Sequence, residues 1–372
     1  MKRAWKNMGD LATFVNGYAF KPTDWSASGA PIIRIQNLTG SMSEVHYYAG
    51  GLDEKYRVHA GDILISWSAS IGVYEWKQTD GWLNQHIFKV VFDKERVNQN
   101  YFKYAAADAL KKAAGLVHGS TMKHLTKKVF DKIPVAFYDA AVQEKIVAVL
   151  QKIDGAISNR QRVLTLLDEL VRSRFVEMFG NKNYEREKLK DLCKKITDGT
   201  HKTPAYQSDG IPFVSAKNIK HGKLLFDDIK YITQDEYKNI QKRCDVEKGD
   251  LLITKSGSLG MPALVDVDFP FGLFESLAVL KYDREKLHGE FLKAQIESDP
   301  IQHELSLGVK GITIRHLHLN VIGEIGIFVP PLELQNQFAD FVHQVDATKK
   351  AVASQLASLT TLRAKMMQDF FG

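Results

Sequence analysis

The sequence contains no apolar run long enough to cross a membrane. A membrane-spanning helix needs about 18 or more consecutive apolar residues, and no such stretch occurs among the 372 residues. The opening residues Met1–Trp5 are not followed by the apolar core of a secretory signal. We therefore expect a cytoplasmic protein that makes no contact with a membrane.

The sequence also lacks common catalytic signatures. It has no Gly-x-x-x-x-Gly-Lys-[Ser/Thr] loop for ATP, no His-Glu-x-x-His and no paired Cys-x-x-Cys. Val329–Leu332 has two prolines but not the asparagine of the Asn-Pro-Pro-[Phe/Tyr] motif of adenine methyltransferases. The only cysteines, Cys193 and Cys244, lack metal-ligand spacing, which favours unpaired thiols over a disulfide. These absences predict a chain with no catalysis, cofactor or metal of its own.

What the sequence does contain is an internal repeat. Gly119–Leu125 returns as Gly311–Leu317, and Gly61–Ser66 returns as Gly249–Thr254. Further matched positions are Gln143 with Gln335, Asp154 with Asp346, Phe179-Gly180 with Phe371-Gly372, Pro31 with Pro212, and Asn37 with Asn218. Because the offset drifts from 181 to 188 to 192 residues along the chain, we infer a duplication in which loops changed length and the framework did not.

Net charge is distributed unevenly over the repeat. The chain carries +6 in total, of which residues 1–140 carry +5 and residues 141–180 carry +1. Residues 181–332 and 333–372 are each neutral. Charge alone is therefore weak support for a polyanionic partner, and a phosphate-binding surface in the second half requires local clustering of basic residues.

Each repeat begins with a globular part, residues 1–140 and 181–332, of mixed α+β class. Short β-rich runs punctuated by Gly, Asn, Asp and Pro predict strands joined by turns. The runs are Pro31–Leu38, Asp62–Ser66, His86–Phe92, Ile211–Ile219 and Leu251–Thr254, and the intervening helices are expected over Tyr101–Leu116 and Glu290–Leu307.

Each repeat ends in a long helix, within residues 141–180 and 333–372. Apolar residues recur every three or four positions from Ala141 to Met178 and from Glu333 to Phe371, without a proline. The seam comprises Ile146, Val149/Leu150, Ile153, Ile157, Leu164, Leu167, Val171 and Phe175/Met178 in one helix, and Phe338, Phe341/Val342, Val345, Val352, Leu356, Leu359, Leu362 and Met366 in the other.

Helices of this length favour packing against each other. Thirty-eight residues span about 57 Å at about 1.5 Å per residue, more than a domain of this size needs; the alternative is that each helix covers only its own domain. An antiparallel coiled coil with pseudo-two-fold symmetry would hold two similar domains apart. Such a pair of modules at fixed spacing matches the symmetry of duplex DNA.

The order of these parts resembles the specificity subunit of type I restriction-modification systems. The resemblance covers essentially the whole chain and rests on Ile33–Leu38, the Gly-Asp-[Ile/Leu]-Leu-Ile-[Ser/Thr] strand, the Gly-x-Thr-x-[Lys/Arg]-His-Leu segment, and the Pro-Pro-x-x-x-Gln helix start at Pro330–Gln337. The counterpart of that helix start, Tyr138–Lys145, keeps the glutamine but not the prolines. No single motif is specific, but their repeated order is.

The resemblance implies two target recognition domains that each read half of a gapped, asymmetric site in double-stranded DNA. The helices would set the gap and dock two methyltransferase subunits, which flip out an adenine and methylate its N6 atom. A translocating restriction subunit can join the complex. S-adenosylmethionine, ATP and Mg would then belong to those partners.

Candidate DNA contacts lie in loops after strands and in basic segments. Small hydroxyl-rich loops let backbone N–H groups approach phosphates, arginine pairs with guanine, and amides pair with adenine. The candidates are Lys21, Arg34, Gln36, Trp67, Ser68, Ser70, Gln85, Lys123, Lys127, Lys128, His201, Lys202, Lys217, Lys255, Ser256, Ser258 and Arg315. Of these, residues that differ between the repeats are the better candidates for sequence choice.

Structural roles remain open for several repeated residues. Asn37 and Asn218 can stabilise turns, Thr121 and Thr313 can cap turns, and His124 and His316 can be framework residues. The hydroxyl-rich loops can equally be tight surface turns.

Two other classes of function also remain open: a stand-alone sequence-specific DNA-binding protein, and a metal-dependent nuclease. Asp198 with His201, or Asp62 with Asp250, would be the acids of such a nuclease, although the repeated aspartate more simply caps a turn.

Overall fold

The chain folds into two units, each with its own sheets and helices. The computed structural model describes residues 3–41, 44–68, 70–116, 127–180, 182, 184–308 and 316–372. Unit 1 comprises Met1–Gln161 and Ser354–Gly372, and unit 2 comprises Arg162–Ala353. The mixed α+β class is confirmed. No helix in the described part of the chain is both long and apolar enough to span a membrane.

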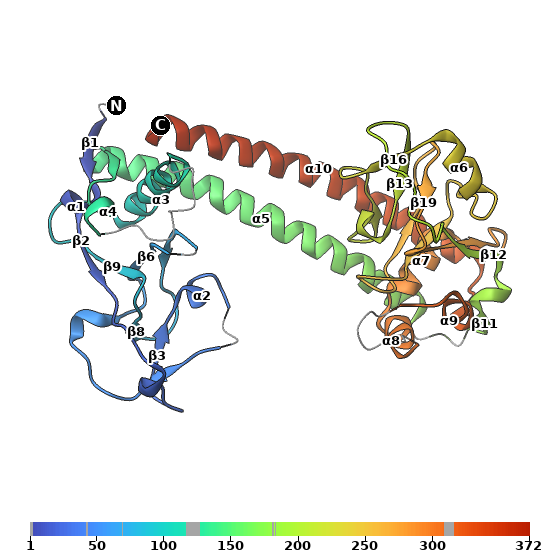
Figure 1. The fold of residues 1–372 in the computed structure, drawn as a ribbon, viewed down its shortest axis with the longest axis horizontal. Coiled ribbons are helices and arrows are strands. Elements are labelled where there is room, and N and C mark those ends of the chain that lie inside the picture. The colour runs from blue at the N-terminus through green and yellow to red at the C-terminus, as the bar shows by residue number, and fades with distance from the viewer. Residues whose placement is uncertain are drawn as a thin grey trace. The chain divides into compact units, whose positions relative to one another are not determined.

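Unit 1 contains two four-stranded sheets and a two-stranded one (Figure 1). The first is antiparallel, in the order β2 (Thr13–Asn16), β9 (Ile87–Val91), β6 (Ile63–Ser66) and β7 (Gly72–Glu75). The second has the order β4 (Tyr47–Tyr48), β3 (Ala30–Ile33), β8 (Gly81–Leu83) and β5 (Arg57–Val58), with β3 parallel to β8. β1 (Ala4–Asn7) pairs with β10 (Pro134–Phe137), and the helices are α1 (Met8–Leu11), α2 (Ile35–Leu38), α3 (Gln99–Leu116) and α4 (Lys127–Phe130).

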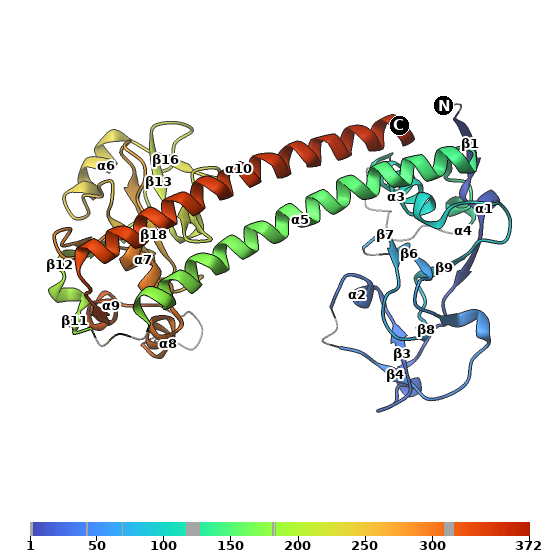
Figure 2. The same ribbon diagram turned by 180° about the vertical axis from the view of Figure 1, so that it is seen from behind.

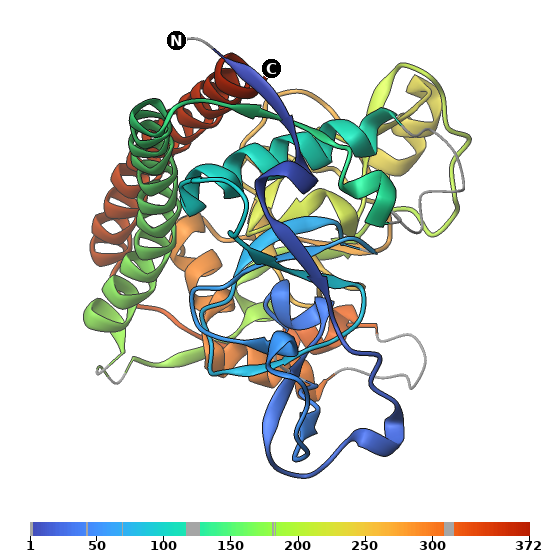
Figure 3. The same cartoon turned by 90° about the vertical axis from the view of Figure 1, so that its left-hand side faces the viewer.

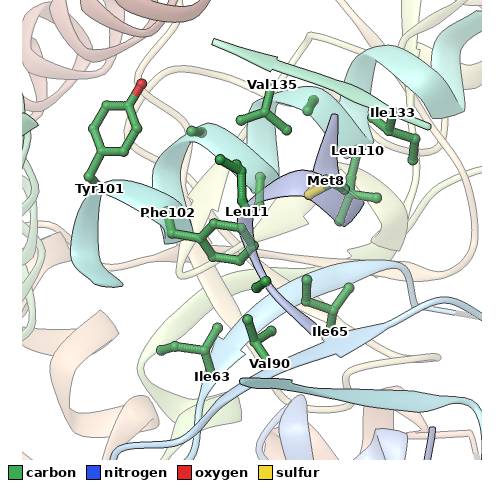
Figure 4. Packing of buried hydrophobic residues seen from close by; sticks show 14 of the residues in the cluster. Met8, Leu11, Ile63, Ile65, Val90, Tyr101, Phe102, Leu110, Ile133 and Val135 are labelled. Carbon is green, nitrogen blue, oxygen red and sulfur yellow. The ribbon is translucent and has the colours of Figure 1, made fainter. Parts of the chain in front are cut away.

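Strand β6 is buried on both faces. Ile63 and Ile65 point toward α3 and pack with Phe102 and Val90 (Figure 4), whereas Leu64 points the other way into a second cluster. Successive side chains of a strand alternate between faces, so an unbroken apolar run is what two covering layers require. Each such residue contributes about 1.5–3 kcal/mol through burial.

Unit 2 has a main sheet with the strand order of unit 1, but its second sheet has one strand fewer, and a β-hairpin and a helix are added (Figure 2). Its main sheet runs β12 (Cys193–Asp198), β20 (Leu277–Tyr282), β17 (Leu251–Thr254) and β18 (Pro262–Leu264). A second sheet runs β16 (Lys230–Ile232), β13 (Ile211–Val214) and β19 (Gly272–Leu273), with β13 parallel to β19. The remaining elements are β11 (Arg186–Lys188) with β21 (Gly326–Phe328), β14 (Ile219–Lys220) with β15 (Lys223–Leu224), and helices α6 (Gln234–Gln241), α7 (Gly289–Glu297), α8 (Asp299–Leu307) and α9 (Leu319–Glu324).

The repeated Gly-Asp pair forms the turn that enters β6 and β17. Gly61 and Gly249 have φ of +97° and +87°, which glycine adopts without strain. The carboxylates of Asp62 and Asp250 each accept a 2.9 Å hydrogen bond from the backbone N–H three residues earlier. These aspartates therefore hold a turn, as the simpler of the two interpretations predicted.

The two long helices are α5 (Ala140–Phe179) and α10 (Leu332–Phe371). Within unit 1, Asp154 pairs with Arg363 at 2.5 Å and Arg160 donates to Gln355 at 2.7 Å, so the start of α5 runs antiparallel to the end of α10 (Figure 3). In unit 2 the end of α5 runs antiparallel to the start of α10. Its contacts are Asp168 with Lys349 at 2.7 Å and Phe175 with Phe338, whose ring centroids are 5.5 Å apart.

The seam prediction was wrong at Leu362, which is 42% exposed. At the paired position Val149/Leu150, Leu150 is buried as expected and Val149 is 39% exposed. The half-buried stripe of α10 runs through Leu359, Arg363 and Met366 instead, because the helical period places position 363 in the seam. There the aliphatic stem of Arg363 packs while its guanidinium meets Asp154.

A buried glutamine at the start of each long helix ties that helix to its globular part. Gln143 accepts a 2.9 Å bond from the Asn98 N–H and donates to the Tyr138 carbonyl at 2.8 Å. Gln335 accepts from the His288 N–H at 2.8 Å and donates to the Lys286 and Pro330 carbonyls. Because both side chains are fully buried, these bonds explain why the glutamine recurs.

Two expected strands break in the middle. Pro31–Leu38 becomes β3 followed by α2, and Ile211–Ile219 becomes β13, a 3₁₀ turn (Ala216–Asn218) and β14. Asn37 and Asn218 cause the break, since their Oδ1 atoms accept from the N–H groups of Arg34 and Ser215 at 2.9 and 3.0 Å. Such side-chain caps favour a tight turn over a strand.

The expected helix over Glu290–Leu307 is instead two helices, α7 and α8. Ser298 between them has extended backbone angles, φ −68° and ψ 145°. Pro300 lies in the first turn of α8, where its missing N–H is tolerated, whereas inside a continuous helix it would break the hydrogen-bond ladder.

Both cysteines are free. Burial raises the thiol pKa of Cys193 and Cys244 to about 12. Reactive thiols need a lowered pKa, so these side chains act as small apolar groups in unit 2.

Candidate nucleic-acid interface

In unit 1, strands β2 and β6 flank β9 and end at the same edge of the sheet. β2 ends at Asn16, and Trp67 directly follows β6. The Trp67 indole N–H donates to the Asn16 amide oxygen at 3.2 Å, and its ring stacks on Phe88, centroids 5.8 Å apart. Asn16 and neighbouring Tyr18 are exposed. The result is an uncharged site that combines amides with aromatic rings.

In unit 2, the same strand ends carry charge. β12 ends at Asp198, and Lys255 directly follows β17. The Lys255 ammonium lies 2.5 Å from the Asp198 carboxylate, and their side chains are only 11% and 3% exposed. The Arg243 guanidinium also reaches this carboxylate, at 2.5 Å. His201 lies 3.3 Å from Asp198 and 2.7 Å from Glu275.

Backbone contacts make the two places equivalent. Gln85 N–H donates to the Tyr18 carbonyl at 2.8 Å, as Glu275 N–H donates to that of Thr200 at 3.0 Å. Likewise the Trp67 N–H donates to the His86 carbonyl, and the Lys255 N–H donates to the Ser276 carbonyl. His86 and Ser276 directly follow Gln85 and Glu275. We call these places the strand-end clusters, consisting of Asn16, Tyr18, Trp67 and Gln85 in unit 1, and Asp198, His201, Arg243, Lys255 and Glu275 in unit 2.

A glycine after each first strand allows the close approach. A Cβ on Gly17 would lie 1.9 Å from the Asn84 carbonyl oxygen, and one on Gly199 would lie 2.0 Å from that of Leu273. Real Cβ atoms never come so near a backbone oxygen, so only glycine permits the framework that both clusters share.

Charge pairing governs the ionisation of Asp198. Burial acts to raise the pKa of its carboxyl, but hydrogen bonds from Lys255 and Arg243 outweigh burial and hold the pKa below its ordinary value. Asp198 is thus a carboxylate at neutral pH. It fixes Lys255 in place, while Arg243 and His201, with side chains 54% and 52% exposed, face solvent.

Four of the predicted contact residues fall in the strand-end clusters: Trp67, Gln85, His201 and Lys255. Four serines were also predicted in the adjacent loops. Ser68 and Ser256 are half-buried, Ser70 and Ser258 are exposed, and the carbonyls of Ser68 and Ser258 accept from the hydroxyls of Ser66 and Thr254. The loops are therefore braced turns with part of their surface accessible.

Other predicted residues lie elsewhere in their units. Arg34 stacks over Trp25, 4.9 Å from the ring centroid, and Gln36 donates to the Glu44 carbonyl at 3.0 Å. Lys217 is exposed on the 3₁₀ turn after β13. Lys21, Lys128 and Lys202 are exposed, and Lys127 pairs with Asp131 at 2.8 Å.

The Gly-x-Thr-x-[Lys/Arg]-His-Leu segments fall mostly outside the described residues. These include the candidates Lys123 and Arg315, together with Thr121, Thr313 and His124. His316 is exposed.

Sequence reasoning missed Asn16, Tyr18, Arg243 and Glu275, and treated Asp198 only as an acid. A signal existed for Asn16, Tyr18 and Asp198, because aligning the Asp198–Pro204 loop with the Asn16–Lys21 loop pairs Asn16 with Asp198. Glu275 lies outside these loops. Arg243 gave no signal, since it reaches the cluster from the end of α6, 45 residues away from Asp198 along the chain.

No group of three or more His, Cys, Asp or Glu side chains able to hold a metal occurs among the residues that the structure describes. Asp198, proposed with His201 as a nuclease acid, is occupied by two cations.

A family model for the type I restriction modification DNA specificity domain matches the chain twice, over residues 3–166 and 181–360. The chain is 22% identical over 403 residues to the specificity subunit of the type I restriction enzyme EcoBI from Escherichia coli, covering 98% of this chain and 84% of that protein. It is 19% identical over 332 residues to the MjaVIII specificity subunit from Methanocaldococcus jannaschii, covering 83% and 78%.

Solved structures share the fold. The S subunit of a type I system from M. genitalium aligns with a TM-score of 0.57 and 14% identity, covering 100% of this chain and 96% of that one. A chain from a study of complex assembly and conformational transition of the type I R-M system aligns with a TM-score of 0.60 and 15% identity, covering 98% and 96%.

Proposed function

Because the chain belongs to the type I restriction-modification DNA specificity family, we propose that it is the recognition subunit of such a complex, with each globular part reading one half of a gapped DNA site. The observation that carries this is the double family match, one for each globular part. The strand-end clusters support it, since the framework is the same while the side chains differ. Two different readers predict an asymmetric target.

In this proposal α5 and α10 set the gap between the half-sites and dock methyltransferase subunits. Apolar residues that the helix–helix seam leaves uncovered support docking. On α5, Leu166 and Leu170 lie one turn apart and are 48% and 46% exposed. Exposed apolar surface of this kind is typical of protein interfaces.

The chemistry would reside in the partners. Two methyltransferase subunits would bind S-adenosylmethionine and methylate adenine N6 after flipping the base out of the duplex. A restriction subunit, where present, would use ATP and Mg. The specificity subunit is the non-catalytic part of such a complex, and its own task is to place the partners on the DNA.

The test is co-expression with the methyltransferase subunit from the same operon, followed by genome-wide mapping of methylated adenines. We expect one gapped motif with two unlike halves. A map without a gapped motif would contradict the proposal. Tight sequence-specific binding by the purified chain alone would instead indicate a stand-alone DNA-binding protein.

Salt dependence gives an independent check. Phosphate contacts release counterions, so affinity of the complex for its site should fall steeply with salt, by about 10³–10⁵ between 50 and 200 mM for six to ten contacts. An affinity that does not change with salt would contradict DNA recognition through these surfaces.

A further inference from the structure

The most informative difference between the strand-end clusters is at Gln85 and Glu275. Both side chains lie in the middle of a three-residue connection that joins a short strand to the next strand, β8 to β9 and β19 to β20. Both have their backbone N–H fixed by the carbonyl two residues beyond the end of β2 or β12. The main chain therefore delivers two side chains of similar shape, one amide and one carboxylate, to the same place in each unit.

Neither side chain has a buried structural role. Gln85 is half-buried, and its amide has no hydrogen-bond partner among the described residues. The Glu275 side chain is 38% exposed and contacts His201 through one oxygen only. Each thus keeps hydrogen-bonding capacity that the described side chains around it do not use up.

The groups around each side chain differ in the same sense as the side chains themselves: neutral around Gln85 and charged around Glu275. Around Gln85 lie the exposed Tyr18 and the half-buried Trp67, which offer apolar surface and no charge. Around Glu275, His201 bridges to Arg243, whose Nη2 is 3.1 Å from the His201 ring. An exposed guanidinium and a carboxylate in one cluster supply donors and acceptors together.

The hydrogen-bonding groups on base edges in the major groove differ in which of these two clusters they fit. Adenine presents an acceptor at N7 and a donor at N6, which one amide satisfies with two hydrogen bonds. Cytosine presents the N4 donor and guanine the O6 and N7 acceptors, which a carboxylate and an arginine satisfy. A carboxylate next to DNA is repelled by phosphates. Because Asp198 neutralises Lys255, the charge that offsets this repulsion is that of the exposed Arg243 guanidinium.

Resting on the proposed function, we infer that Gln85 and Glu275 are equivalent specificity-determining residues, Gln85 reading an adenine in one half-site and Glu275 the cytosine of a G·C pair in the other. Arg243 contacts the guanine of that pair. Asp198 is a positioning residue, because it contacts Arg243 and Lys255 but is itself buried. The two half-sites therefore differ in base class at corresponding positions.

The experiment exchanges the two functional groups. Gln85→Glu and Glu275→Gln are each co-expressed with the methyltransferase subunit, and methylated adenines are mapped beside wild type. Gln99→Glu and Glu285→Gln make the same chemical changes at exposed positions outside the clusters and serve as matched controls. Because all four changes preserve side-chain shape, we expect the fold to be retained.

We expect each cluster variant to change one base position, in opposite halves of the motif, with about 5- to 150-fold altered preference between A and C. The control variants should give the wild-type motif. A gapped wild-type motif that neither cluster variant alters would overturn this inference and leave the proposed function intact. If a variant complex methylates too weakly to map, its binding to duplexes with single base changes decides: equal weakening on every sequence overturns the inference.

Discussion

The strand-end clusters of the two units have one framework and opposite chemistry. Unit 1 closes the gap between its strand ends with a neutral hydrogen bond from Trp67 to Asn16. Unit 2 closes it with a buried ion pair between Lys255 and Asp198. Since the glycine, the backbone bonds and the strand order are the same, the difference shows that the framework does not depend on what its side chains carry. The duplication thus preserved the backbone framework, while the side chains on it diverged.

The largest contrast should come from deleting the first partner of each pair. Asp198→Ala leaves Lys255 buried without a counter-charge, which costs about 3–5 kcal/mol. Asn16→Ala removes one exposed neutral hydrogen bond and should cost about 1 kcal/mol or less. Urea unfolding followed by hydrogen exchange would localise each loss to its unit, and equal losses would contradict the comparison.

A common framework predicts equal damage from the glycines. In Gly17→Ala and Gly199→Ala the new methyl group meets a backbone oxygen, so the strand end must shift, at about 1–3 kcal/mol in each unit. Thermal unfolding measures both, and Gly155→Ala, where nothing lies within 4 Å of the new Cβ, is the control. Damage in one unit only would show that the frameworks are not equivalent.

Lowering the pH should destabilise unit 2 more than unit 1, by less than the Asp198→Ala substitution does. The folded-state pKa of Asp198 lies below its ordinary value, so its pairing stabilises unit 2 above an unfolded-state pKa of about 3.9 and is lost as pH falls through the lower folded-state value. Protonation leaves some hydrogen bonds in place, so the effect should be weaker than in Asp198→Ala. In the wild-type protein, amides of unit 2 should lose protection from hydrogen exchange as the pH falls. In Asp198→Asn the same amides should already be less protected at neutral pH. The Asn16–Trp67 cluster has no carboxylate, so unit 1 should show no such step.

The smallest effects are expected at the helix pairs. Arg363→Ala and Lys349→Ala each remove a half-exposed ion pair between α5 and α10, worth about 0.2–1 kcal/mol. Circular dichroism during urea unfolding would measure both, with Lys350→Ala on the exposed face of α10 as control. A loss of several kcal/mol at either position would mean that charge, not apolar packing, holds the helices.

Much of the fold followed from the sequence because periodicity and repetition record burial. The two long helices were expected within one residue of their ends, since an apolar position every three or four residues marks a face that needs a partner. Leu362 was misplaced because hydrophobicity alone cannot show that the stem of Arg363 takes the seam position. Asn37 and Asn218 broke expected strands because one side-chain bond to the main chain outweighs β propensity.

The candidate site was only partly predictable, for a physical reason. Trp67 and Lys255 follow strands that a motif marks, so local sequence pointed to them. Arg243 and Glu275 reach their cluster by tertiary folding from segments without a motif, and no local pattern records that approach. Which base each side chain reads depends on the chemistry of the assembled cluster, so it could not be taken from single residues.

The buried glutamines at the starts of α5 and α10 also define where this chain can be recombined. The side-chain hydrogen bonds of Gln143 go to Asn98 and Tyr138, and those of Gln335 go to Lys286, His288 and Pro330. A recombination crossover downstream of either glutamine transfers a recognition domain together with the glutamine that binds it, so the hydrogen bonds between helix and domain are kept. A crossover upstream of the glutamine joins the helix to a domain whose loops need not match that glutamine. Natural shuffling and engineered chimaeras should therefore share the same permitted cut sites, just inside the helices.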